Sequence, residues 1–249
     1  MTGWRKRIIA ALTVAPIAGS AAAEGPRWEF TASPYLWVPG NTTSVETGLG
    51  TLETDASISD VLSATEVALM GVFEARLGRW GLIADLFYAD LSERRPTPFG
   101  TLFANARVRT ELRIGTGYAA YRLHDDAGIS FEFLGGFRAA DVGLDVTLSP
   151  GVLPGQSFDL GDSWIDPVAG GRLKVDLTDR WSVMAIADFG GRPSGSSRTW
   201  QAAAMVAYRV GDRWTAHAGW RHMVFEREMG GRDVEIDLGG PLVGLSIGF

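Results

Sequence analysis

The sequence predicts an all-β fold, an antiparallel transmembrane β-barrel of about ten strands, with eight or twelve strands as alternatives. Three observations predict it. Apolar and polar residues alternate with a period of two along many strand-length segments, as in a sheet with two different faces. Short and long connections alternate strictly along the chain, which is typical of transmembrane barrels. Most tryptophans lie near expected strand ends, where the interfaces of a bilayer would be.

The N-terminal segment 1–23 is interpreted as a cleaved signal peptide. Residues 4–7 supply a basic start, residues 8–18 are apolar, and residues 21–23 form a small-residue cleavage site before Glu24. A retained membrane anchor is the alternative, but the apolar run is shorter than the about 20 residues that a spanning helix needs. The barrel is therefore expected to occupy residues 24–249.

The mature chain of 226 residues contains no cysteine, so an exported protein of this kind is not a disulfide scaffold. Removing Arg5, Lys6 and Arg7 leaves 20 basic and 29 acidic residues, a net charge of −9, which argues against nucleic acid as a partner. Lys174 is the only lysine left, and arginine is the cation suited to multidentate pairing.

Ten segments alternate and are bounded by turn residues. They are 27–38, 66–77, 80–92, 102–123, 128–147, 163–177, 181–190, 198–210, 214–228 and 233–249. The tight connections are expected on the periplasmic side, at 78–79, 124–127, 178–180 and 211–213. The other connections are expected to be extracellular loops, at 39–65, 93–101, 148–162, 191–197 and 229–232.

Segment 39–65 requires a separate decision, because residues 42–57 could form a hairpin and raise the strand count to twelve. Glu46, Glu53 and Asp55 leave no apolar face long enough to meet lipid, so the segment is expected to be an extracellular hairpin above the barrel. Residues 59–64 suggest a short turn of helix.

The polar face of the strands is expected to point into the barrel. It carries six acidic and nine basic side chains: Glu74, Asp85, Glu111, Glu132, Asp166, Asp188, Arg76, Arg107, Arg109, Arg113, Arg138, Arg172, Lys174, Arg209 and Arg221. Burying so many charges requires pairing, so a connected ion-pair network is expected. The network either fills a narrow barrel or lines a small pore, which the arginine excess would bias toward anions.

The opposite face is expected to meet lipid, partly because it contains many alanines that would underfill a dry core. Aromatic girdles are predicted at its two ends, from Trp28, Trp80, Trp181 and Trp214 on the periplasmic side and from Trp37, Trp164 and Trp200 on the other.

The C-terminal strand resembles the closing strand of bacterial outer-membrane barrels, because Gly244, Ile247 and Phe249 match its usual pattern and Leu242 departs from it. The resemblance implies recognition by the barrel-assembly machinery. More widely, the chain resembles small Gram-negative outer-membrane β-barrel proteins of the porin-like and OmpA-like type. The segments that carry this are 33–37, 74–81, 164–167, 178–181 and 219–221. The resemblance implies a fold and an outer-membrane location, and no established activity.

No cofactor, metal or catalytic residue is predicted. An Asp/His site could be imagined from His222 with Asp141 and Asp145, but no Ser–His pair of recognisable spacing accompanies it, so no enzyme is predicted. The expected function is that of a structural or narrow porin-like barrel, with surface recognition through loops 39–65 and 148–162 as the alternative. Expected partners are membrane lipid and lipopolysaccharide, and a monomer is expected.

Overall fold

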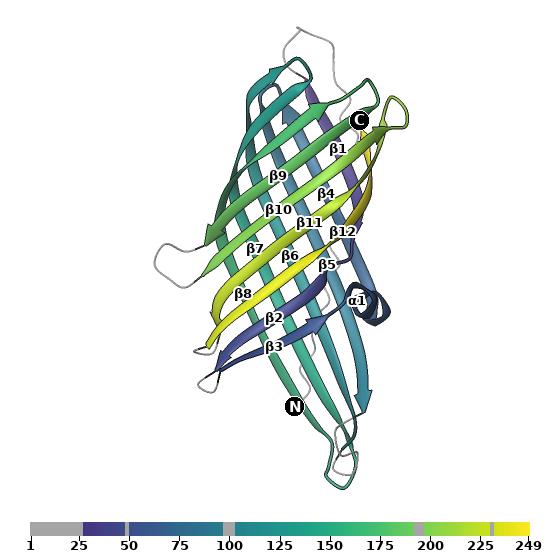
Figure 1. The fold of residues 1–249 in the computed structure, drawn as a ribbon, viewed down its shortest axis with the longest axis vertical. Helices are drawn as coiled ribbons and strands as arrows, with labels where there is room; N and C mark the ends of the chain where they lie inside the picture. Colours follow the sequence, from purple (N-terminus) through teal and green to yellow (C-terminus); the bar gives the residue numbers. More distant parts are fainter. Residues whose placement is uncertain (1–26, 48–49, 97–102, 192–196, 230–231) are drawn as a thin grey trace.

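The computed structural model describes residues 27–47, 50–96, 103–191, 197–229 and 232–249. Ten strands form one closed antiparallel barrel (Figure 1). They are β1 (Trp28–Trp37), β4 (Thr65–Leu77), β5 (Trp80–Pro96), β6 (Phe103–Asp126), β7 (Ile129–Pro150), β8 (Gln156–Asp176), β9 (Trp181–Gly191), β10 (Arg198–Arg209), β11 (Trp214–Met229) and β12 (Arg232–Gly248). The predicted fold class is confirmed. The expected signal peptide and its cleavage site lie outside the described residues.

Two further strands, β2 (Gly40–Thr47) and β3 (Gly50–Ala56), form a hairpin that extends the sheet beyond β12. Helix α1 (Ile58–Ala64) follows, and it is the helical turn expected from the sequence. A capping box between Ser57 and Asp60 begins this helix. It is too short to cross a membrane, and the described residues contain no longer apolar helix.

The barrel closes between β1 and β12, and this seam has an unusual continuation. Trp37 pairs with Leu242 at the end of β1. Gly240, two residues before Leu242 in β12, passes close to Val38. A Cβ atom on Gly240 would lie 2.0 Å from the Val38 carbonyl oxygen, so only glycine fits. The N-terminal part of β12, from Val234 to Gly239, pairs with β2 instead of β1.

Tight turns gather at one end of the barrel, which we call the turn end. The connection between β6 and β7 is the two-residue turn Ala127–Gly128, and both residues have positive φ angles, 52° and 76°. This is the backbone of the hairpin turn whose twist matches the flanking strands. The Asp126 carboxylate accepts a hydrogen bond from the Ala127 amide at 2.8 Å.

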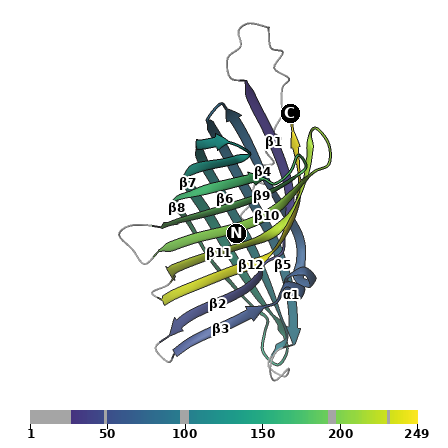
Figure 2. The same cartoon turned by 45° about the horizontal axis from the view of Figure 1, so that its top comes forward.

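At the other end, β5–β8 run well past their neighbours, and we call this region the extension (Figures 1 and 2). The prediction of a long loop over 148–162 was wrong, since β7 continues to Pro150, β8 begins at Gln156, and Leu148 pairs with Gln156. Strand β6 has 24 residues, about twice the 9–11 that cross a bilayer. Strands beyond a bilayer need no apolar outer face, so this part lacks the lipid-facing pattern.

Candidate functional site

The barrel interior is the candidate site, because alternate side chains of every strand converge there. Strand β10 shows the alternation clearly: Gln201 is 3% exposed, whereas the next residue in the chain, Ala202, and the preceding Trp200 are exposed. The inward set is assigned on each strand from this alternation and from the register of neighbouring strands.

Nearest the turn end lies a cluster that we call the inner network, formed by Glu74, Arg76, Glu132 and Arg172. Arg172 Nη1 on β8 lies 2.8 Å from Glu74 Oε2 on β4, across the interior. Arg76 Nη2 lies 2.6 Å from Glu132 Oε1 on β7. Arg122, which was not among the predicted residues, donates from Nε to Glu132 at 3.1 Å. The contacts of Arg172 with Glu74 and of Arg76 with Glu132 tie together strands that do not neighbour each other in the sheet.

The next layer, the central network, is centred on an ion pair between Arg138 and Asp188 at 2.8 Å, with neither side chain exposed. Tyr118 Oη donates to Asp188 Oδ2 at 2.6 Å, and Gln201 Nε2 donates to the same oxygen at 2.6 Å. Arg138 also donates to Thr199 Oγ1 on β10 at 3.1 Å. The buried charges are therefore paired and hydrogen-bonded, as burial requires.

A second half of the central network lies against β1 and β5. Arg221 Nη2 contacts Asp85 Oδ2 at 2.8 Å and donates to Gln201 Oε1 at 2.7 Å, which joins the two halves. Tyr35 Oη donates to Asp85 Oδ1 at 2.7 Å. The Arg221 guanidinium also lies over the Trp37 ring, 4.9 Å from its centroid.

Toward the extension, the interior becomes apolar. Trp37 and Phe87 meet edge-to-face at 5.3 Å, and Trp164 and Phe225 do so at 5.7 Å. The full apolar cluster comprises Trp37, Met70, Phe87, Ala89, Ile114, Ala140, Trp164, Met223, Phe225, Leu238 and Leu242. Arg227 lies over the Trp164 ring at 4.5 Å and approaches Asp166 at 3.6 Å.

These layers fill the interior in the part of the chain that the structure describes. Leu134, Arg138, Asp166 and Met223 are each 0% exposed, although they come from three strands, β7, β8 and β11, and from different layers. A ten-stranded barrel has an interior between the side-chain-filled and open-channel types, and this one is of the filled type.

Two predicted residues lie at the edge of the interior near the turn end. Lys174 pairs with Asp176 at 2.8 Å, with both side chains partly exposed. Arg209 is exposed at the end of β10. Neither contacts the central network through any interaction shown for the described residues.

The orientation predicted for strand 102–123, which is β6 in the structure, was wrong along its length. Ile114, Thr116, Tyr118 and Ala120 are buried inside, so the odd-numbered residues of this strand face outward. Four predicted interior residues therefore lie on the outer surface: Arg107, Arg109, Glu111 and Arg113. The apolar partners that we expected to meet lipid, such as Leu112, instead pack against the apolar cluster inside.

These side chains form a charged ladder on the outer face of the extension. Arg109 Nε donates to Asp90 Oδ1 at 2.9 Å, and its Nη2 also contacts that carboxylate. Arg113 Nη2 donates to Glu111 Oε2 at 2.6 Å and approaches Asp141 at 3.6 Å. The hydrogen bonds from Arg109 lower the pKa of Asp90.

The ladder begins abruptly along the outer face. Leu86, Phe137 and Ile165 are 63%, 63% and 57% exposed and mark an apolar wall, whereas Arg113 and Asp141 lie in the next outward row of the paired strands. One row further than Glu111, Asp145 pairs directly with Asp159. A hydrogen bond with Asp159 and repulsion between the two carboxylates raise the pKa of Asp145. The apolar-to-charged transition is where hydrocarbon contact ends.

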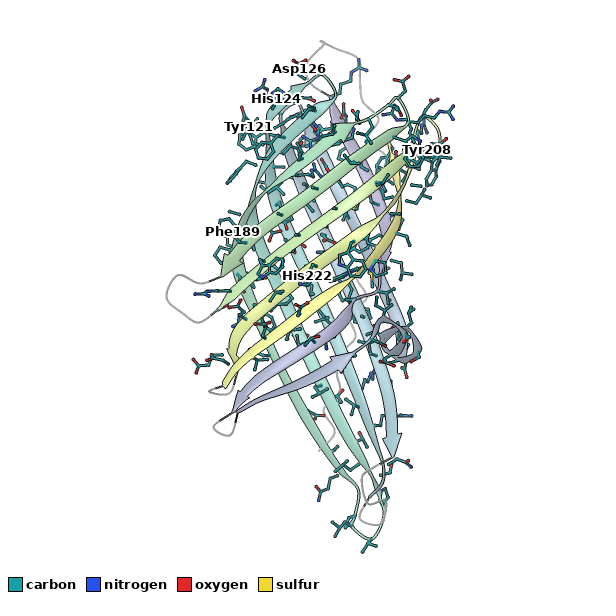
Figure 3. All side chains as sticks on the ribbon, in the orientation of Figure 1. Tyr121, His124, Asp126, Phe189, Tyr208 and His222 are labelled. Carbon is teal, nitrogen blue, oxygen red and sulfur yellow. The ribbon has the colours of Figure 1, made fainter. Side chains whose placement is uncertain are left out.

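Two predicted girdle tryptophans were also misplaced. Trp37 and Trp164 are 1% and 5% exposed inside the apolar cluster. The other five lie on the outer face: Trp28, Trp80, Trp181, Trp214 and Trp200 are 52%, 61%, 47%, 44% and 38% exposed. Tyr121 and Tyr208 join them at the turn end, where Trp80 and Trp181 pack against their rings (Figure 3).

The histidines do not form the imagined Asp/His site. His222 faces outward from β11 and its Nε2 lies 3.1 Å from Asp237 Oδ1. Asp141 and Asp145 lie on the outer face of β7, which does not neighbour β11. His217 lies inside near the turn end and hydrogen-bonds Ser246 Oγ at 2.6 Å. The described residues contain no cluster of three metal-ligating side chains.

At the closing strand, Phe249 exchanges backbone hydrogen bonds with Phe30 and stacks on its ring at 5.9 Å. Gly244 pairs with Tyr35, and Ile247 pairs with Ala32, so both belong to the seam. Recognition of these residues by an assembly machinery stays a prediction.

The central network also uses residues that sequence reasoning missed, namely Tyr35, Tyr118, Thr116 and Thr199. Gln201 lies on the polar face that the alternation predicts for its strand, but its role as the link between the two halves was not predicted. Neutral polar groups give no charge signal, and their role depends on which strands meet across the interior, which the period of two does not reveal.

No protein-family model and no curated protein matches the sequence. Among solved structures, the outer membrane protease OmpT from Escherichia coli is similar at 10% identity with a TM-score of 0.53, over 90% of this chain and 97% of that one. The translocator domain of autotransporter NalP from Neisseria meningitidis is 14% identical with a TM-score of 0.42, over 91% and 89%. Ail of Yersinia pestis is 11% identical with a TM-score of 0.38, over 91% and 100%. At such identities the likeness to OmpT shows the fold alone, that of an outer-membrane β-barrel.

Proposed function

We propose that this chain is a closed, non-conducting barrel of the outer membrane that anchors a recognition surface outside the cell. In this arrangement the turn end is periplasmic, and the extension of β5–β8 together with the β2–β3 hairpin is extracellular. The proposal selects the structural reading of the interior over the narrow pore, and it assigns recognition to the extension.

The closed interior is the observation that carries the proposal. The inner network links β4 to β7 and β8, and the central network links β6 and β7 to β9 and β10. A solute would have to break both layers and then separate the apolar cluster. Filled barrels of this kind act as rigid scaffolds, while conduction needs a continuous polar path.

The charged ladder supports a surface role for the extension. Arg113 and Asp141 are more than half exposed at 56% and 51%, in a part of the sheet that lies beyond the apolar wall. Nothing in bilayer crossing requires strands of 21–24 residues. A rigid sheet with paired charges and exposed arginines is suited to a polar macromolecular partner.

Planar-bilayer recording tests the closed interior. The purified protein is expected to give no current above background, while the variant carrying Arg138→Ala, Asp188→Ala and Trp37→Ala is expected to leak because the central network and the apolar cluster are both thinned. Regular single-channel currents from the native protein would reject the closed-barrel proposal.

A shortened extension tests recognition. Replacing residues 145–159 with a two-residue turn should leave heat-modifiable gel mobility unchanged and abolish binding of the purified protein to immobilised polyanionic or polycationic polysaccharide, with the matched replacement of residues 178–180 as control. If the protein binds neither polysaccharide, or binds equally with and without the extension, the assignment of recognition to it is wrong.

A further inference from the structure

The outer wall of β7–β10 contains a groove of about 450 Å³ that the proposed function does not use. It is almost wholly apolar. Its lining is Phe133, Ala169, Gly170, Gly171, Ala187, Asp188, Phe189, Trp200, Gln201 and Ala202.

Small residues form the floor of this groove, and aromatic residues form its walls. Ala169 and Gly171 on β8, Ala187 on β9 and Ala202 on β10 all face outward. The walls are Phe133, Phe189 and Trp200, which are 52%, 71% and 38% exposed. Four small residues between three large exposed rings leave a channel on this part of the outer surface.

Close packing of the backbone, as well as the small size of the residues, keeps larger side chains out of the floor of the groove. A Cβ on Gly170 would lie 2.2 Å from the Ala187 carbonyl oxygen, so strands β8 and β9 approach closely at this point. A Cβ on Gly171 would lie 3.1 Å from the Phe131 ring. The hollow is therefore part of the architecture of the wall.

One end of the groove meets polar groups. Trp200 stacks on His222 with ring centroids 5.0 Å apart and planes inclined by 14°. Arg198, two residues further toward the extension on the same face of β10, has a side chain that is 79% exposed. Figure 3 places Phe189 and His222 on the extension side of Tyr121 and Tyr208.

We propose that this groove binds an acyl chain of lipopolysaccharide in the outer leaflet, with a phosphate of its headgroup held near Arg198 and His222. This rests on the outer-membrane location in the proposed function. The groove is continuous with the lipid-facing wall, so hydrocarbon is what reaches it. A chain lying from Phe133 to Trp200 brings its headgroup to the end that carries the Arg198 guanidinium and the His222 imidazole.

The polar neighbours of these donors are compatible with a phosphate. Arg198 Nη1 is 3.7 Å from Glu226, so the Arg198 guanidinium keeps further donor capacity, and His222 Nε2 lies 3.1 Å from Asp237. Arginine binds phosphate oxygens through its fork of N–H groups. Trp200 lies between the apolar groove and the donors, the place that an amphipathic indole favours at an interface.

Native mass spectrometry of the full mature protein, refolded in detergent and titrated with lipid A, tests the proposal. Ala187→Leu fills the floor and is expected to lower lipid A binding on the order of tenfold, because two excluded methylenes are worth about that factor. Ala185→Leu, at an exposed position on the same face of β9 outside the groove, is the matched control and should bind as the native protein does.

A second pair tests the headgroup. Arg198→Gln should weaken lipid A binding, while Arg209→Gln at the other end of β10 should not. Equal binding by the Ala187→Leu and Ala185→Leu variants, or equal affinity for phosphatidylglycerol and lipid A in the native protein, overturns the proposal. Heat-modifiable mobility confirms folding of each variant, and outer-membrane fractionation separately tests the location on which the proposal rests.

Discussion

Arg138 on β7 and Asp188 on β9 meet inside the barrel at 2.8 Å, and both side chains are completely enclosed. They lie on strands separated in the sheet by β8, so their contact bridges that strand on the inside of the barrel. Removing one partner leaves the other charge buried and uncompensated, which costs far more than removing both.

Arg138→Met is therefore expected to lower the free energy of unfolding by about 3–5 kcal/mol, and the double variant Arg138→Met/Asp188→Leu should recover most of that loss. Urea titration followed by heat-modifiable gel mobility measures both. The exposed pair of Arg113 and Glu111 provides the control, because Arg113→Ala should cost no more than about 1 kcal/mol. A double variant as unstable as the single one would contradict this view of the interior.

The reversed orientation of β6 gives a prediction that needs no stability measurement. The chain has no cysteine, so single cysteines can be introduced against a clean background. In intact cells, a membrane-impermeant maleimide should label Arg113→Cys and leave Tyr118→Cys unlabelled, since Tyr118 is 4% exposed. Absence of labelling at Arg113→Cys would contradict the outward orientation of this residue and restore the one expected from the sequence.

The facing carboxylates of Asp145 and Asp159 predict a pH dependence confined to the extension. The folded-state pKa of Asp145 is raised above its ordinary value of 3.8, so the folded extension binds more protons than the unfolded one. Its stability is then greatest below that ordinary value and falls as the pH rises through the raised pKa. Hydrogen exchange of 141–163 should show less protection at pH 7 than at pH 4, once corrected for intrinsic rates.

Asp159→Asn should remove this difference and increase protection at pH 7, because the repulsion disappears. The turn-end hairpin between β8 and β9 is the internal control. If the native extension is equally protected at both pH values, the two carboxylates do not share a proton.

The space around Gly136 on β7 and Gly117 on β6 predicts different effects on stability when each is replaced by alanine. A Cβ on Gly136 would lie 1.8 Å from the Gly117 carbonyl oxygen, whereas a Cβ on Gly117 meets nothing within 4 Å. Gly136→Ala should destabilise the barrel by about 1–3 kcal/mol or more, and Gly117→Ala should be close to neutral. Urea midpoints of the two variants measure the difference, and similar midpoints would count against the strand packing described above.

Periodicity and turn chemistry were enough to predict the ten barrel strands, the tight turns and most of the inward charges. Strands such as β10 lie mainly within the apolar wall, so the outward face of the strand is consistently apolar and its inward face is consistently polar. Gly211 and Asp212 mark a turn through residue type alone, without reference to the rest of the fold.

The same reasoning failed where a strand leaves the bilayer. Along β6 the apolar residues from Val108 to Ile114 face the interior, while the charges face water, so a period of two is preserved with the faces exchanged. Trp37 and Trp164 failed for a related reason. A tryptophan near a strand end fits an interfacial girdle or an apolar cluster equally well, and only its neighbours across the interior decide between them.

The pairing of β12 with both β1 and β2 has a consequence for how the cylinder is completed. In a closed sheet the joint between first and last strands has the largest separation along the chain and is the last to gain contacts. Here residues 31–45 follow β12 almost without interruption, and Gly240 accepts one alignment with Val38. A shift of β12 by two positions would place a side chain against that carbonyl. The close contact at Gly240 and the continued pairing with β2 therefore fix the register in which β12 closes the barrel against β1.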